Sequence, residues 1–124
     1  MSPLTKHFHE AVLALAGHAP IKQRLVCAYS DHLSGVHDED LPRRVLARFS
    51  DLRRRLHSVT PLNGEGPVRA SVRKMSGPEA ADCAKIIVAL YGELARREAA
   101  DSTGPLHLVR APELEDVPDF LLKS

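Results

Sequence analysis

The chain of 124 residues has no tryptophan, and phenylalanine and tyrosine together supply only five aromatic side chains. A hydrophobic core must therefore be built mainly from leucine, valine, isoleucine and alanine, which suits α-helices. Hydrophobic residues still make up 44% of the chain and charged residues 27%, as in ordinary globular proteins, which excludes disorder of the whole chain. A chain of this length can form one domain with its own core and is too short for two ordinary domains.

Cysteine and long apolar runs are also scarce. Cys27 and Cys83 are too few for a disulfide framework. Each lies in an apolar stretch of an expected helix, so we expect two buried free thiols in a reducing cytoplasm, with a single bridge between them as the alternative. The longest apolar run, residues 86–91, is far shorter than the roughly 20 residues of a membrane span, and residues 1–7 lack a secretory pattern. We therefore expect a cytoplasmic protein with no membrane association.

What the chain does contain is hydrophobic periodicity typical of helices. Residues 4–17 and 20–33 each place apolar side chains on one face, and Ser2 and Pro3 suit the start of the first helix. The fold class we predict is all-α, a compact antiparallel bundle of about four helices with an irregular loop near residues 60–75 and an extended C-terminal tail. Residues 1–104 are expected to form a single helical-bundle domain, and residues 105–124 an acidic tail.

The third expected helix has the clearest pattern. The acidic residues 38–40 would lie at its N-terminus, where the helix dipole favours negative charge, and Pro42 would lie in its first turn. Pro61 would end it. Spacings of four, three, four and three predict a seam packed against neighbouring helices, formed by Val45, Phe49, Leu52, Leu56 and Val59.

The segment after Pro61 is harder to interpret. Residues 61–67 have the composition of a loop, and residues 68–73 alternate in a way that fits either a short strand or the start of a helix. Residues 76–79 form a capping-box pattern at the start of a fourth helix that extends to about residue 100. Residues 80–91 are apolar on nearly every side, which predicts either a central helix of a monomer or a homodimer formed through this helix or the one before it.

The charge distribution is the strongest functional indication. The net charge is only +1, but residues 41–75 hold nine Lys and Arg against two acidic residues. On the third helix, five arginines project within an arc of about 140°. This face could meet an acidic protein or peptide surface, lie along the phosphates of a nucleic acid, or be a solvated face partly neutralised by Asp51. The predicted partner-binding residues are Arg43, Arg44, Arg48, Arg54, Arg55, Arg69, Arg73 and Lys74.

The C-terminal segment carries the opposite charge. It contains four acidic residues between positions 113 and 119, and apolar residues at both of its ends. We therefore expect that the tail either docks on the basic face of its own chain and masks it or engages a partner. The acidic residues are Glu113, Glu115, Asp116 and Asp119.

Signatures of catalysis or metal binding are lacking in the sequence. None of the seven histidines shows the spacing of a metal site, and both cysteines lie in apolar stretches that would bury the thiol. We therefore predict no catalytic, cofactor-binding or metal-binding residue and no cofactor. The function that we predict is a non-catalytic interaction or regulatory module. A nucleic-acid-binding protein is the alternative, and a small helical enzyme is the third hypothesis.

Overall fold

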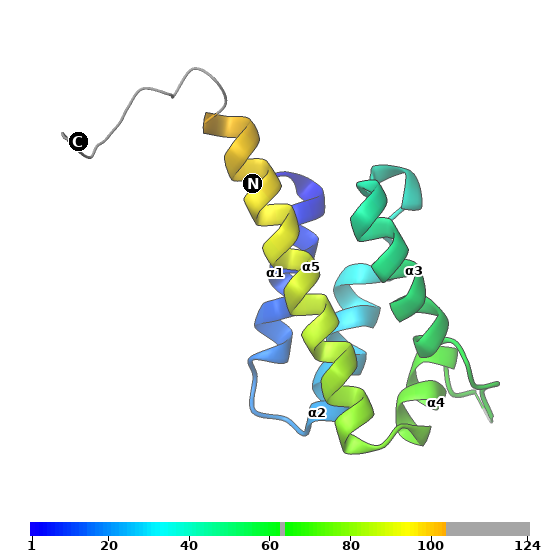
Figure 1. Ribbon diagram of the computed structural model, residues 1–124. Helices are drawn as coiled ribbons and strands as arrows, with labels where there is room; N and C mark the ends of the chain where they lie inside the picture. The colour runs from blue at the N-terminus through cyan, green and yellow to red at the C-terminus, as the bar shows by residue number, and fades with distance from the viewer. Residues whose placement is uncertain (63, 104–124) are drawn as a thin grey trace.

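The computed structural model describes residues 1–62 and 64–103, and these residues form a helical protein without strands (Figure 1). The all-α prediction is confirmed for them. Five α-helices are present where about four were expected, and the predicted tail at residues 105–124 lies outside the described residues. The elements in chain order are α1 (Pro3–Leu15), α2 (Ile21–Ala28), the π-helix η1 (Tyr29–Leu33), the 3₁₀-helix η2 (Asp38–Asp40), α3 (Arg43–Leu56), α4 (Pro67–Lys74) and α5 (Gly77–Thr103).

Helices α1 and α5 lie side by side and run in opposite directions (Figure 1). Ser2 caps α1 as predicted, because its Oγ accepts a hydrogen bond from the Thr5 backbone N–H at 3.2 Å. The Ser2 backbone N–H donates to Oε2 of Glu98 at 2.7 Å, and the Thr5 hydroxyl reaches the same oxygen at 3.3 Å. The first turn of α1 is therefore fixed to the C-terminal part of α5.

The second predicted helix, residues 20–33, is present but changes type along its length. It begins as α2 and continues as η1, in which the Ser34 N–H donates to the Tyr29 carbonyl, five residues earlier, at 2.9 Å. Tyr29 and Leu33 are both buried in this wider turn. Periodicity predicted the extent of this helix, but it could not distinguish π from α geometry.

Three expectations for the third helix are wrong. The acidic residues 38–40 form η2 and not the first turn of α3, because Leu41, which precedes Pro42, is extended (ψ 133°) and separates the two elements. Helix α3 ends at Leu56, so Pro61 does not end it, and Val59 lies outside it and is only half-buried. The other four residues of the predicted seam are buried in the core, as predicted: Val45, Phe49, Leu52 and Leu56.

Residues 68–73, for which the sequence allowed either a strand or a helix, belong to the helix α4. Pro67 occupies its first turn, and Val68 and Val72 lie one turn apart and are both buried. The irregular segment is therefore shorter than predicted, because α4 occupies residues 67–74. Ser71 is buried, and its Oγ accepts a hydrogen bond from the Val59 N–H at 3.0 Å, which ties the loop to α4.

Helix α5 begins with the predicted capping box. The Ser76 N–H donates to Oε1 of Glu79 at 2.8 Å, and the Glu79 N–H donates to Oγ of Ser76 at 3.1 Å. The apolar segment that follows buries its inner side within the chain, and Val88 remains 48% exposed. The fully buried residues of this segment are Ala80, Cys83, Ile87 and Leu90.

The two cysteines differ in exposure, and both are free thiols. Cys83 is buried, as predicted, but the prediction that Cys27 is buried is wrong. Leu25 and Ala28 are the buried residues of α2. Cys27 is two residues from Leu25, and the helical rotation of about 200° over two residues turns its side chain away from the core.

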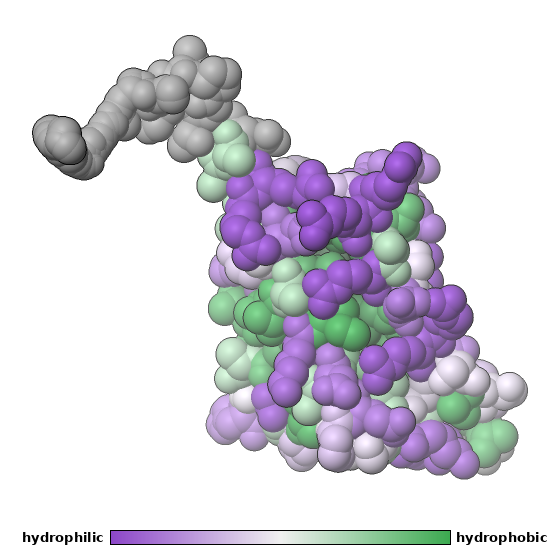
Figure 2. All heavy atoms as spheres, in the orientation of Figure 1, coloured by the Kyte–Doolittle hydropathy of each residue, from purple (hydrophilic) through white to green (hydrophobic). Residues whose placement is uncertain are grey.

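Aromatic contacts join the helices at the centre of the core. The rings of Phe8 and Phe49 meet edge to face, with centroids 5.7 Å apart, and the ring of Tyr29 stacks on Phe49 at 6.4 Å. Figure 2 shows an apolar area midway along the α5 side of the molecule, bordered by polar side chains. Across residues 1–62 and 64–103, no helix has both the length and the apolar content needed to cross a membrane.

Candidate functional site

The outer side of α3 carries three exposed arginines, Arg43, Arg44 and Arg48. They lie on the first two turns of the helix, on the side away from the buried residues Val45 and Phe49. Within the described part of the chain, none of the three forms an ion pair or a side-chain hydrogen bond with another residue. These guanidinium groups are therefore available for an external anionic group.

The second half of α3 uses its arginines differently. Arg54 pairs with Asp51, as the sequence spacing allowed. Arg53 pairs with Asp38 through both terminal nitrogens, one of them 3.3 Å from Oδ2, and its guanidinium lies 5.0 Å from the centre of the Phe49 ring. The hydrogen bond from Arg53 lowers the pKa of Asp38. Arg53 was not among the predicted site residues, and its contacts give it a structural role.

A shallow hollow of about 270 Å³ lies where the end of α3 meets the start of α5. Arg54, Arg55 and Glu79 line it together with Met75. The pKa of Glu79 is lowered mainly by the hydrogen bond from the Ser76 backbone N–H, and the positive charge of Arg55 adds a smaller effect. Arg54 and Arg55 therefore face carboxylates of their own chain and are partly neutralised.

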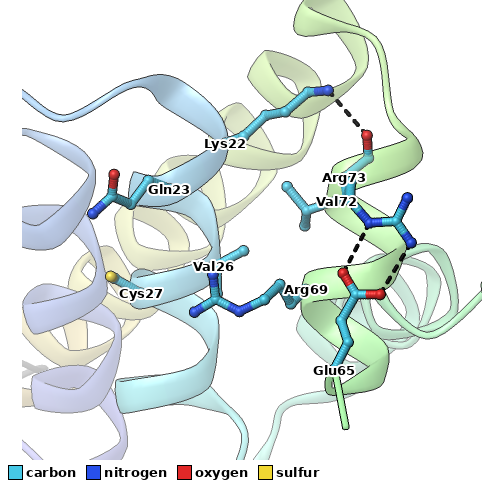
Figure 3. A pocket seen from close by; sticks show the side chains of 8 residues that line it. All are labelled: Lys22, Gln23, Val26, Cys27, Glu65, Arg69, Val72 and Arg73. Atoms are coloured by element: carbon cyan, nitrogen blue, oxygen red, sulfur yellow. Dashed lines mark hydrogen bonds and ion pairs between the residues drawn. The ribbon is translucent and has the colours of Figure 1, made fainter. Parts of the chain in front are cut away.

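A larger pocket of about 400 Å³ lies between α2 and α4 (Figure 3). Arg69 and Arg73, one turn apart on α4, face this pocket from one side. Arg73 binds Glu65 through two parallel hydrogen bonds of 2.8 and 3.0 Å, which lower the pKa of Glu65. One of the two predicted basic residues in this pocket is therefore already paired.

The α2 side of this pocket supplies residues that the sequence analysis did not select. The Lys22 ammonium donates a hydrogen bond to the Arg73 carbonyl oxygen at 3.3 Å, at the end of α4. Figure 3 shows the Arg69 side chain extending across the pocket toward Val26, with the exposed Cys27 nearby. Lys22 and Cys27 could not be linked to Arg69 from the sequence, because more than 40 residues separate them.

The predicted basic residues thus occupy three separate settings. Arg43, Arg44 and Arg48 lie on the outer side of α3, Arg54 and Arg55 line the hollow at the start of α5, and Arg69 and Arg73 line the pocket against α2. Lys74 is exposed at the end of α4. On the outer side of α3, all three arginines are exposed, and no carboxylate of residues 1–62 and 64–103 is bound to them.

Metal binding and nucleophilic catalysis each require particular groups of side chains. In the described part of the chain, no group of three or more His, Cys, Asp and Glu side chains is placed to hold a metal ion. His32 Nδ1 lies 3.6 Å from Oε1 of Glu10, which joins η1 to α1. Burial raises the pKa of the Cys83 thiol, which disfavours the nucleophilic thiolate.

Comparison with known proteins adds no relative from which a function could be transferred. No protein-family model matches this chain, and no curated protein or solved structure shows a significant match to it.

Proposed function

We propose that this protein is a non-catalytic binding module that presents a basic face, centred on α3, to an acidic surface of another protein or peptide. The observation that carries this proposal is the group of three exposed arginines on the outer side of α3, none of them bound to a carboxylate of the described residues. Arginine pairs with carboxylates through a planar fork, and complementary charge gives both specificity and fast association. Arg54 and Arg55, which carboxylates of their own chain partly neutralise, continue this face toward the end of α3. Lys74 is exposed at the end of α4 and is the last basic residue assigned to the proposed interaction.

The small number of unpaired arginines favours an acidic protein surface over a nucleic acid, because affinity for a nucleic acid rises with the number of phosphates that are neutralised. Arg54 and Arg73 are bound to carboxylates of the same chain, which reduces the number of phosphates that the protein could neutralise. The nearest aromatic residue on α3, Phe49, is fully buried and offers no surface for stacking bases. Nucleic-acid binding by the same residues is therefore the second hypothesis.

Charge reversal on α3 tests the proposal. The triple variant Arg43→Glu, Arg44→Glu, Arg48→Glu should lose at least about tenfold in affinity for a fluorescein-labelled poly-glutamate peptide, measured by anisotropy at low salt. The helix should persist, because glutamate is favourable near a helix N-terminus. Circular dichroism checks that the variant remains folded.

A matched control reverses three exposed basic residues elsewhere, Lys6, Lys85 and Arg96, and thus changes the net charge by the same amount. Equal loss of affinity in the two triple variants would show that only net charge matters and would overturn the proposal. The nucleic-acid hypothesis is tested with duplex DNA and single-stranded RNA. Stronger binding to either than to the peptide, with a steep dependence on salt, would replace the acidic protein by a nucleic acid.

The proposed module would act in a reducing compartment such as the cytoplasm, and the two free thiols are consistent with this.

A homodimer through residues 80–91 remains a proposal supported by the exposed Val88 and by the half-buried Ala81, Ala84 and Ala89. Light scattering after size exclusion distinguishes the two states, and Val88→Glu should convert a dimer into a monomer.

A further inference from the structure

The pocket between α2 and α4 has an unbalanced charge that the basic face of α3 does not explain. Arg73 and Glu65 neutralise each other through their two hydrogen bonds. The Lys22 ammonium contacts a neutral carbonyl oxygen, and no described residue forms an ion pair or a side-chain hydrogen bond with the Arg69 guanidinium. Two positive charges therefore remain without a bound carboxylate at one pocket.

The same pocket also offers apolar surface. Val26 of α2 and Val72 of α4 line it, and its volume of about 400 Å³ lies within the range typical of small-molecule sites. Figure 3 shows the Arg69 side chain reaching across the opening from α4 toward α2, so that a ligand there would contact both helices. The Lys22 ammonium is directed to the end of α4, so Arg69 is the cationic group that lies beside Val26. A cationic group beside an apolar wall fits a ligand that has an anionic end and an apolar body.

We propose that the α2–α4 pocket binds a small organic anion, a carboxylate or a phosphate ester, with its charge held by Arg69 and its apolar part packed against Val26 and Val72. The planar fork of arginine donates two parallel hydrogen bonds to the oxygens of either anion. This site is separate from the proposed docking face, because none of the three exposed arginines near the start of α3 lines it. Either proposal can fail while the other holds.

Direct titration tests the ligand class. Benzoate and phenyl phosphate carry the two anionic groups on the same apolar body, benzamide is a neutral counterpart of benzoate, and inorganic phosphate lacks the apolar body. In ¹H–¹⁵N spectra of the full chain, benzoate or phenyl phosphate should shift amide signals of residues 22–27 and 65–73 in a saturable manner. Benzamide and inorganic phosphate should bind at least about tenfold more weakly. The tighter of the two organic anions identifies the preferred anionic group.

Variants of the pocket test the assigned residues. Arg69→Gln should weaken the preferred anion at least about fivefold, and Lys22→Gln should weaken it less, because the Lys22 ammonium lies on the other side of the pocket. Arg96→Gln, an exposed site on α5, should leave the affinity unchanged. Absence of saturable shifts with both organic anions would overturn the proposal. Equal binding of benzamide, equal binding of inorganic phosphate, or equal affinity in all variants would also overturn it.

Cys27 provides an independent local readout, because its exposed thiol lines the pocket whereas Cys83 is buried. Its thiolate attacks one sulfur of a disulfide reagent and forms a mixed disulfide, while the S–S bond of the reagent breaks and its other half leaves as a thiolate. The rate of this step depends on the local potential when the reagent is charged. The rate with the dianionic Ellman's reagent, divided by the rate with neutral 4,4′-dithiodipyridine, should fall roughly threefold or more in Arg69→Gln. Cys27→Ser identifies the fast phase, and an unchanged rate ratio in Arg69→Gln would contradict the assigned charge.

Discussion

At the scale of single residues, neighbouring arginines on one helix have different roles. Arg43 and Arg44 face outward, whereas Arg53 is held by Asp38 and lies over the ring of Phe49. Phe49 in turn contacts Phe8 of α1 and Tyr29 of η1. Because three segments of the chain meet at this one ring, its side chain should contribute strongly to stability.

Phe49→Ala should therefore lower the free energy of unfolding by about 3–5 kcal/mol, since it removes a fully buried aromatic side chain and leaves a cavity. Urea denaturation followed by circular dichroism measures the change. Leu13→Ala is the control, because Leu13 is 57% exposed and its truncation should change stability by less than about 0.5 kcal/mol. If Phe49→Ala lowered the free energy of unfolding by less than about 1 kcal/mol, the central packing of Phe49 against Phe8 and Tyr29 would be contradicted.

At the scale of secondary structure, α5 carries two glutamates that each bind the start of a helix. Glu79 accepts from the Ser76 N–H at the start of α5, and Glu98 accepts from the Ser2 N–H at the start of α1. In each case this backbone hydrogen bond is the main reason why the pKa of the carboxyl is lowered. The Glu79 contact could be predicted because its partner is three residues away. The Glu98 contact joins residues 96 positions apart, and no local pattern indicates it.

These lowered pKa values predict acid sensitivity. A carboxyl whose folded-state pKa lies below its unfolded value stabilises the fold fully above the unfolded pKa, and this stabilisation is lost as the pH falls. The free energy of unfolding should therefore decrease from about pH 5 to about pH 3. The double variant Glu79→Gln, Glu98→Gln should show a smaller decrease, and Asp38 and Glu65, whose pKa values are also lowered, should account for part of the remainder.

Urea titrations at a series of pH values measure this dependence. Glu39→Gln is the control, because Glu39 is exposed and its carboxylate forms no hydrogen bond with another described residue. The free energy of unfolding should depend on pH in the same way in Glu39→Gln as in the unaltered protein. An identical slope in the double variant would show that the two helix-start contacts do not form in solution.

At the scale of the whole molecule, the positive charge of residues 41–75 is divided between separate surfaces. Part of it is paired within the chain, as in Arg73 with Glu65, and part remains exposed on the outer side of α3. The acidic tail proposed to mask this face lies outside the described residues. The opposite charges of the two segments in the sequence are the reason to test this hypothesis.

Deletion of residues 106–124 should strengthen binding of the poly-glutamate peptide at low salt, because an attached acidic segment competes with an external one at high effective concentration. Fluorescence anisotropy with the deleted and full-length chains measures the effect. The gain should disappear in the triple α3 variant described above. Unchanged affinity after deletion would rule out masking by the tail.

The sequence alone determined the helical class, most helix positions, the Ser2 cap, the capping box at Ser76 and most of the α3 seam, because these depend on neighbours within about one helical turn. Tertiary structure decided which charges remain free. Whether an arginine is paired depends on residues distant in the chain, as with Arg53 and Asp38, and the pocket joins Lys22 to Arg69 only because α2 packs against α4. Local periodicity carries no information about such contacts, so the sequence predicted a basic face and the packing of the helices divided it.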